Sequence, residues 1–299
     1  MKFQATANTP VPRWGQSASI FIAVVLLVVG CASPAPLLAP RKAQAIEANS
    51  RGAVLFSRGD YAGAIEQYRH ALDFERSIEN EDGIASNLIN LSIAYQRLGD
   101  GAAARAAVEE ILDNPYLRFP APRVAEAALR KAILLLEARD VDAASQWLER
   151  TRSGCAQADC PLGGKILNVQ AQLALLKTDY TGARDAATRA LAANRARSDR
   201  EEIANSLRLL GAALIEIRRS EEVGPLLNEA LAIDKDLALP PKIFRDLVLL
   251  GRAAMARNLT GDAAAFFRRA SAVARSLSDP AALAEADGLL QSARPPEPR

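Results

Sequence analysis

The sequence predicts an all-α fold, an α-solenoid of about six helix-turn-helix repeats with a 40-residue period and a C-terminal capping helix. The prediction rests first on a column of small residues that returns at steps of 40, 40, 39, 40 and 40 residues. The column comprises Gly52, Ser92, Ala132, Ala171, Gly211 and Gly251. Small residues at a fixed phase let paired helices approach closely, so the column is typical of stacked helical hairpins.

Three further columns keep the same register. Twelve residues after the first column stand Ala64, Ala104, Ala144, Ala183, Val223 and Ala263. Four residues later come the mostly bulky Tyr68, Val108, Leu148, Ala187, Leu227 and Phe267. Three more residues lead to the mostly small Ala71, Ile111, Thr151, Ala190, Ala230 and Ala270. An alanine-rich bundle without repeats is the alternative, but turn residues also recur at one phase, as in Gly59-Asp60-Tyr61 and Thr178-Asp179-Tyr180.

The stretch Leu88–Leu112 (LINLSIAYQRLGDGAAARAAVEEIL) shows this pattern most clearly. It resembles a tetratricopeptide repeat (TPR), and the resemblance extends over about Ala45–Ala284. That family has a usual period of about 34 residues, so each copy here is about six residues longer. The extra residues fall after each second helix, in polar stretches such as Glu75–Asp82 and Arg195–Glu202, and either lengthen the helix or loop outward. The resemblance implies a right-handed superhelix stabilised by stacking of neighbouring repeats.

Residues 1–30 are expected to be an export signal. Lys2 and Arg13 precede the apolar run Ile20–Val29, which is shorter than the roughly 20 residues needed to span a bilayer. The run ends in Val28-Val29-Gly30-Cys31, which resembles the bacterial lipobox. That resemblance implies cleavage before Cys31 and attachment of lipid, such as palmitate, to this cysteine. An ordinary secretory signal or an uncleaved anchor is the alternative.

The remaining boundaries follow from composition. Residues 31–43 are expected to form a lipidated cysteine and a proline-rich, extended tether. The repeat domain is expected over 44–293, and Asp279-Pro280 predicts the start of a capping helix, Pro280–Ser292. Residues 294–299 are expected to be a disordered tail.

The residue after Cys31 bears on the location of the protein. Because this residue is alanine, the lipobox resemblance implies that the protein is anchored in the outer membrane and faces the periplasm, if the host is Gram-negative.

Charge and motifs narrow the function. The chain has 37 basic and 35 acidic residues, without the clustered basic stripe that nucleic-acid binding requires. It lacks a phosphate-binding glycine loop, a nucleophile elbow and a paired-histidine motif, and its single histidine, His70, lies on a predicted surface. We therefore expect no enzyme, no cofactor and no metal. A perturbed carboxylate pair in a closed pocket would favour an enzyme instead.

Two cysteines lie between the third and fourth repeats, in the segment SGCAQADCPLG. In an exported protein Cys155 and Cys160 are expected to form a disulfide that braces this connector. Free thiols are the alternative. A zinc site would need about four ligands, and the nearby sequence does not supply them.

The TPR resemblance also implies a concave groove lined by first-helix residues. Carried onto this chain, the groove residues are Ile46, Asn49, Phe56, Ile89, Asn90, Ile93, Arg97, Arg130, Ile133, Asn168, Gln172, Arg208 and Arg252. The expected function is a non-catalytic, lipid-anchored adaptor that binds a protein or peptide partner of the cell envelope in this groove. The alternatives are a self-associating structural protein, with homo-oligomers, and apolar groove residues that pack inside the superhelix.

Overall fold

The computed structural model describes residues 39–155 and 160–293. The predicted signal, Cys31, most of the tether and the tail lie outside these residues. The described chain contains thirteen α-helices and one short 3₁₀ helix, and no strand occurs within it. None of the described helices is both long enough and apolar enough to cross a bilayer.

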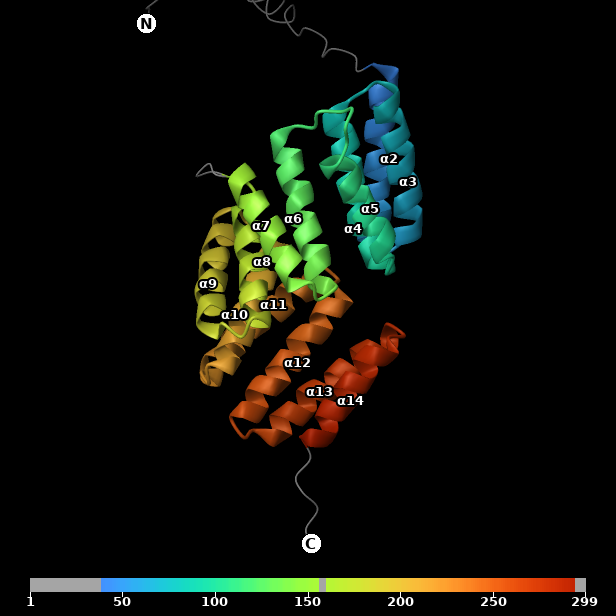
Figure 1. The fold of residues 1–299 in the computed structure, drawn as a ribbon. Coiled ribbons are helices and arrows are strands. Elements are labelled where there is room, and N and C mark those ends of the chain that lie inside the picture. The colour runs from blue at the N-terminus through green and yellow to red at the C-terminus, as the bar shows by residue number, and fades with distance from the viewer. Residues whose placement is uncertain (1–38, 156–159, 294–299) are drawn as a thin grey trace, which may run out of the picture.

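The helices form six consecutive pairs and a final single helix (Figure 1). The first three pairs are α2 (Pro40–Ser57) with α3 (Tyr61–Ser77), α4 (Glu81–Leu98) with α5 (Gly101–Leu112), and α6 (Ala121–Glu137) with α7 (Val141–Gly154). The next three pairs are α8 (Gly163–Leu176) with α9 (Tyr180–Ala196), α10 (Arg200–Glu216) with α11 (Val223–Asp236), and α12 (Pro240–Ala256) with α13 (Thr260–Ser276). The 3₁₀ helix η1 (Ser220–Glu222) precedes α11, and α14 (Pro280–Ser292) follows α13. The predicted all-α solenoid of six pairs with a capping helix is confirmed.

All four sequence columns are buried, so they form the contacts that the repeat requires. The first and third columns meet inside the first, fifth and sixth pairs. A Cβ atom built on Gly52 would lie 2.6 Å from the Tyr68 ring, and one on Gly211 would lie 3.0 Å from Leu227. Gly251 faces the ring of Phe267 in the same way. Glycine therefore stands where its partner is large, because only hydrogen leaves room for the side chain.

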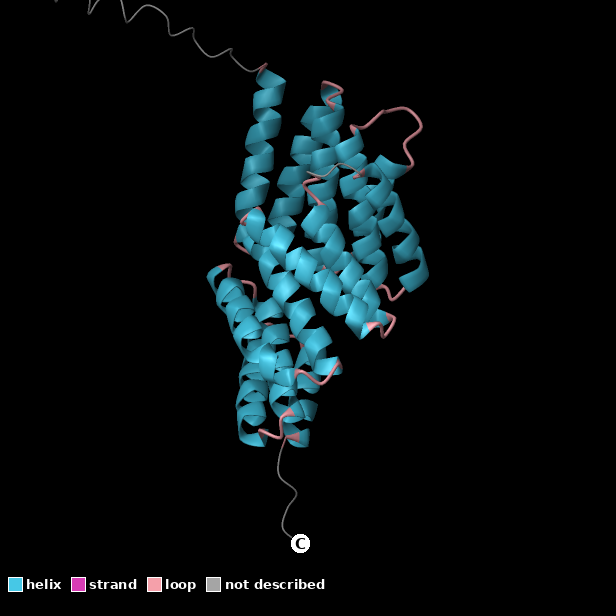
Figure 2. Cartoon of the chain, turned by 90° about the vertical axis from the view of Figure 1, so that its left-hand side faces the viewer, coloured by secondary structure: helices cyan, strands magenta, loops and turns pink. Residues whose placement is uncertain are grey.

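The final helix α14 packs on the end of the sixth repeat. Its Ala286 is fully buried, and Leu283 and Leu289 are partly buried against the core formed by the last repeats. Figure 2 shows the described chain as a stack of helices joined by loops. Since Asp279 accepts hydrogen bonds from the backbone of Ala281 and Ala282, the start of α14 has the predicted cap.

Each repeat is about six residues longer than a usual TPR, and the extra residues lengthen the second helix in some repeats and the connector after it in others. The second helices α3, α9 and α13 have 17 residues each, so the extra residues lengthen these helices. In the second and third repeats, α5 has 12 residues and α7 has 14, and longer connectors follow at 113–120 and 155–162. The extended helices are held by buried polar side chains near their ends. Glu75 accepts a hydrogen bond from Asn80 at 2.7 Å, and Asn194 donates one to Ser206 at 3.0 Å.

The first helix begins earlier than expected. Helix α2 starts at Pro40, so residues 40–43, which the sequence analysis placed in the tether, are helical. Proline is favoured at the first helical position because it has no N–H to leave unpaired and its φ angle suits a helix.

A left-handed residue ends the first helix of every repeat. These residues are Gly59, Gly99, Arg139, Thr178, Arg218 and Asn258. In four of the six copies a side chain occupies a conformation that favours glycine, and for a β-branched residue such as Thr178 (φ 59°) the strain is largest. The following aspartate caps the next helix in the first four repeats, as Asp179 does with Gly182 at 2.9 Å.

We expect Thr178→Gly to raise the free energy of unfolding by about 1 kcal/mol, because glycine removes the strain of the left-handed conformation. Denaturant unfolding of the full chain measures the change. Gly99→Ala is the matched control, since Gly99 has φ 87° and no atom within 4 Å of an added Cβ. That variant should lose stability through strain alone. A Thr178→Gly chain no more stable than wild type would contradict the argument.

Candidate functional site

The first helices α4, α6, α8, α10 and α12 lie side by side in chain order. We call the residues through which they contact one another, and the exposed residues beside them, the first-helix face. Arg97 on α4 also reaches Glu201 on α10, with Nη2 3.5 Å from Oε1. These two residues are 104 positions apart. The row of first helices therefore curves toward this face, as the TPR resemblance predicted.

Much of the predicted groove is used to join neighbouring repeats. Asn90 donates a hydrogen bond to Asn49 at 3.0 Å, which links α4 to α2. Arg130 donates to the side chain and backbone oxygens of Ser92 at 3.2 and 3.1 Å, which links α6 to α4. Burial lowers the pKa of Arg130 to about 10. The buried guanidinium of Arg130 thus joins α6 to α4 at Ser92, a residue of the first column.

Three of the predicted groove residues, Ile89, Arg130 and Asn168, are buried. Asn168 donates to Glu202 at 2.8 Å and accepts from Ser206 at 2.8 Å. For these three residues the expected partner contact is replaced by packing within the solenoid, because consecutive first helices approach too closely to leave them in water.

The other predicted residues remain partly or fully accessible. Those that are half-buried are Asn49, Phe56, Asn90, Ile93, Arg97, Ile133, Gln172 and Arg208. Ile46 and Arg252 are exposed, and Arg252 lies 3.3 Å from Glu285 of α14. The first-helix face therefore offers apolar side chains from the second and third repeats beside charged ones.

In the fourth to sixth repeats, several cations of the first-helix face are paired with acids. Lys242 Nζ lies 2.7 Å from Glu201 Oε1 and 3.0 Å from Asn205 Oδ1. Although burial acts to raise it, Lys242 and then Arg97 and Lys165 hold the pKa of Glu201 below its usual value. The sequence did not predict acidic partners such as Glu201, because an acidic residue on a helix surface gives no signal of which other repeat it will contact.

A second charged group lies inside the junction of α10, α11 and α12. Arg208 donates from Nε to Asp246 at 2.7 Å and from Nη2 to Asp234, and both carboxylates are fully buried. One oxygen of each carboxylate lacks a hydrogen-bond partner among the described residues. Burial raises the pKa of both, that of Asp246 to about 7.

Asp234 and Asp246 form a perturbed carboxylate pair, the feature that would favour an enzyme. Unlike a catalytic pair, however, these two side chains are not accessible to solvent. Because both side chains are enclosed by three helices, a substrate cannot contact them. Its chemistry is that of a buried ion cluster with one cation and two acids.

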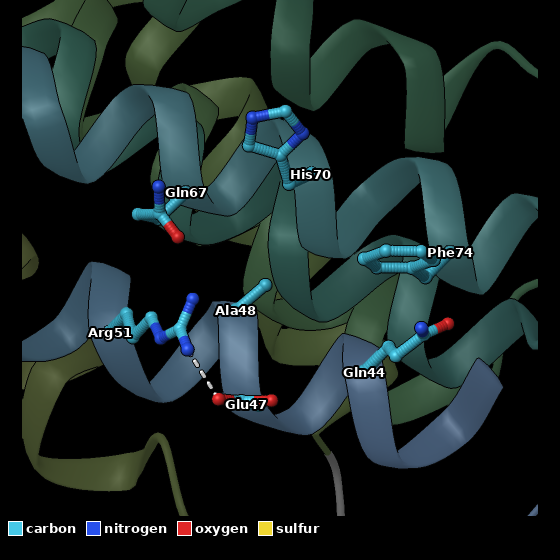
Figure 3. Close-up of a pocket in the computed structure, with 7 residues that line it drawn as sticks. All are labelled: Gln44, Glu47, Ala48, Arg51, Gln67, His70 and Phe74. Carbon is cyan, nitrogen blue, oxygen red and sulfur yellow. Dashed lines mark hydrogen bonds and ion pairs between the residues drawn. The ribbon is translucent and has the colours of Figure 1, made fainter. Parts of the chain in front are cut away.

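A cavity of about 350 Å³ lies between α2 and α3 (Figure 3). It is lined by Gln44, Glu47, Ala48, Arg51, Gln67, His70 and Phe74. One period later, the residues that correspond to the α2 lining are Ile84, Asn87, Leu88 and Leu91, all buried against the preceding helix. The cavity thus lies where, in the second repeat, the preceding repeat packs. Its α2 side is lined mostly by polar residues, as expected for the first repeat of a solenoid.

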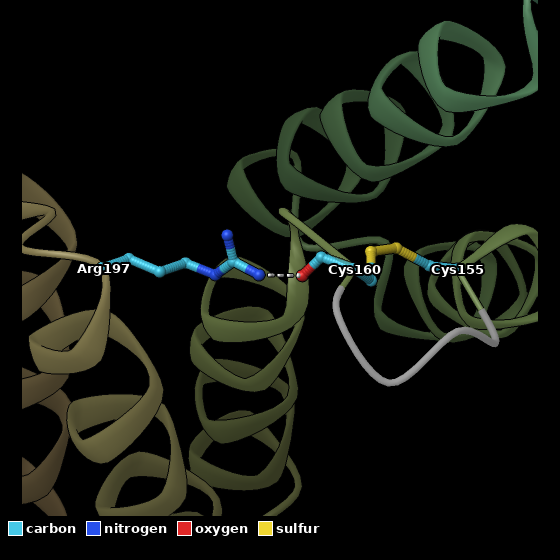
Figure 4. Close-up of a disulfide and its surroundings, with 3 residues drawn as sticks. All are labelled: Cys155, Cys160 and Arg197. Atoms are coloured by element: carbon cyan, nitrogen blue, oxygen red, sulfur yellow. Dashed lines mark hydrogen bonds between the residues drawn. A yellow bond between two sulfur atoms is a disulfide. The ribbon is translucent and has the colours of Figure 1, made fainter.

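The connector after α7 brings Cys155 and Cys160 together in a disulfide (Figure 4). Their Cα atoms are 5.6 Å apart, within the range that a disulfide spans. Arg197 donates a hydrogen bond to the Cys160 carbonyl at 3.2 Å, which ties the connector to the turn after α9. Oxidation of the pair in the cell stays a prediction, which the protein's mass before and after thiol alkylation checks. No group of three or more potential metal ligands occurs in the described residues.

Comparison with known proteins agrees with this geometry. Residues 44–114 match the family model of the tetratricopeptide repeat. The described chain is a TPR-like α-solenoid. No curated protein matches the chain.

Several solved structures have a similar fold. A Rap protein complexed with competence and sporulation factor superposes with a TM-score of 0.56 at 14% identity, over 84% of this chain and 74% of that one. A chain of the APC/C hetero-tetramer Cut9-Hcn1 gives a TM-score of 0.64 at 13% identity, over 93% of this chain and 46% of that one. A STAND ATPase with a TPR sensor from Pyrococcus horikoshii gives 0.60 at 14% identity, over 83% and 36%. The chain spans less than half the length of the last two, and all three establish similarity of fold.

Proposed function

We propose that this chain is a non-catalytic, lipid-anchored adaptor of the cell envelope that binds a protein or peptide segment on its first-helix face. The segment belongs to an envelope protein, and the adaptor supports envelope assembly or biogenesis. It faces the periplasm from the outer membrane, held by lipid on Cys31.

The observation that carries the proposal is the curved first-helix face, which holds the partly buried Ile93 and Ile133 and the charged Arg97. A curved surface that combines apolar and charged side chains suits an extended or helical segment, which gains affinity from burial and specificity from polar contacts. Two structurally similar proteins were solved with partners, one with competence and sporulation factor and one as the Cut9-Hcn1 assembly. These two complexes support a function in protein or peptide binding. The partner of this chain is to be identified by experiment.

Photo-crosslinking in the native cell tests the adaptor function. A crosslinking residue at Ile93, Ile133 or Arg252 is expected to capture one dominant envelope protein, identified by mass spectrometry. Matched control sites are Asp73 on α3 and Gln146 on α7, which are exposed on second helices. Capture of the same protein from the control sites, or capture from none of the three test sites, would contradict binding on the first-helix face.

Labelling with radioactive palmitate tests the anchor. We expect the wild-type chain to incorporate label and to fractionate with the outer membrane, because two or three acyl chains give stable anchoring. Cys31→Ala should abolish the label and leave an unprocessed precursor. Equal labelling of both chains would refute the assignment of Cys31.

Self-association is the second candidate, and exposed side chains on α2 favour it. Ile46 and Val54 are 45% and 48% exposed on the first helix, so two copies meeting there would bury apolar surface. Light scattering of the purified chain over a hundredfold concentration range distinguishes the two functions. A mass that rises with concentration, together with crosslinks only to the chain itself, would favour the structural oligomer.

A further inference from the structure

Glu201 lies where several first helices converge. Its Oε1 atom is 2.7 Å from Lys242 Nζ on α12 and 3.5 Å from Arg97 Nη2 on α4. Lys165 on α8 acts on the same carboxylate electrostatically, and its Nζ is 3.9 Å from Asp199, the N-cap of α10. Lys242 and Arg97 thus contact the Glu201 carboxylate from two other repeats, and Lys165, whose side chain is 43% exposed, adds positive charge from a third.

The cations are positioned by the solenoid. Lys242 is held by Asn205, and its side chain is only 14% exposed, while that of Arg97 is 27% exposed. The side chain of Glu201 between them is 46% exposed, so solvent reaches it. This combination of partly buried, oriented cations and an accessible acid has the form of a carboxylate-binding site whose occupant belongs to the chain itself.

We propose that Arg97, Lys165 and Lys242 bind an aspartate or glutamate side chain of the partner segment, in place of Glu201. The inference rests on the proposed function and specifies the chemistry that the first-helix face recognises. The half-exposed Ile93 lies one helical turn before Arg97 on α4. A fitting segment therefore carries an acidic residue close to an apolar one.

Two consequences follow. Glu201 competes with the partner for the cations, so the free chain keeps its own site filled. The same carboxylate joins α4 to α10, so a partner that displaces it also removes this link across the first-helix face. Binding and a change in the curvature of the helix row are thereby coupled.

The first test uses propionate, which has the shape of a glutamate side chain, and the full chain with Glu201→Ala. The truncation leaves the three cations without this acid, so added propionate is expected to raise the Tm by about 2–4 °C more than chloride at equal ionic strength. Glu229→Ala is the matched control, because Glu229 is an exposed acid of α11 that pairs with Arg195 of α9, outside the cluster. Lys242→Met in the Glu201→Ala chain should remove the response.

Equal responses to propionate and chloride in Glu201→Ala, or an equal propionate response in Glu229→Ala, would overturn the carboxylate site. This result requires no partner, so it is independent of whether the adaptor function holds.

The second test measures competition. Photo-crosslinking from Ile93 in the Glu201→Ala chain is expected to give several times the wild-type yield of the same partner, because the internal competitor is gone. A yield equal to or below that of wild type would overturn competition by Glu201. Absence of any crosslinked partner in both chains would instead contradict the adaptor function and leave the propionate result standing.

Discussion

Gly251→Leu is expected to unfold the sixth repeat and the capping helix, with a loss of about 3 kcal/mol or more in the free energy of unfolding. The backbone of α12 lies directly on the ring of Phe267, which is fully buried, and an added Cβ alone would overlap that ring. The aromatic ring has no flexible end to move aside. Denaturant unfolding followed by circular dichroism measures the loss.

Gly288→Leu is the matched control, because Gly288 lies inside α14 and no atom stands within 4 Å of an added Cβ. That substitution should be neutral or stabilise by up to about 1 kcal/mol through helix propensity. Gly211→Leu should have an intermediate effect, since its neighbour Leu227 is flexible and 3.0 Å away. Equal stability of Gly251→Leu and Gly288→Leu would contradict the packing of the first column on the third.

The chain itself suggests a compensating change. Its third repeat pairs Ala132 with Leu148, and its fourth pairs Ala171 with Ala187. Gly251→Ala combined with Phe267→Leu should therefore be more stable than the sum of the two single changes predicts. The coupling energy of this double-mutant cycle measures the direct contact.

Asp246→Asn is expected to remove a pH dependence of stability that wild type shows between about pH 4 and pH 7. Folding raises the pKa of Asp246 from 3.8 to about 7 through burial, against the opposing effect of Arg208. The native state therefore holds a proton that the unfolded chain releases in this window. The free energy of unfolding falls as the pH rises from about 4 to about 7 and levels off above.

The part of the effect that comes from Asp246 is at most roughly 4 kcal/mol, because one unit of pKa shift corresponds to about 1.4 kcal/mol. Asp234 interacts with Asp246 and its pKa is also raised, so the two acids titrate as a coupled pair. Asparagine resembles the protonated acid, so the variant should match wild type near pH 4 and exceed its stability at pH 8. Urea unfolding at a series of pH values measures both chains.

Asp236→Asn provides the control, since Asp236 lies on α11, as Asp234 does, but pairs with Arg200 at an exposed position. Its stability should follow the wild-type pH profile. Parallel profiles for Asp246→Asn and wild type would contradict protonation of Asp246 in the native state between about pH 4 and pH 7.

Periodic burial made much of this fold predictable. Columns such as Ala64, Ala104 and Ala144 are fully buried, and a residue that must be small in every copy leaves a signal at fixed spacing. Helix ends were also readable where a local side chain forms the cap, as Asp279 does for α14. The start of α2 and the two long connectors were not, because propensity and neighbouring packing decide boundaries together.

The sequence by itself determined the repeat, its register and the capping helix, because each depends on residues close together in the chain. Only the tertiary structure decided which groove residues are buried, and which acids pair with which cations. Glu201 meets Arg97 from 104 residues away, and Asp234 meets Asp246 inside three helices. Such pairings depend on the curvature summed over several repeats, which no single repeat encodes.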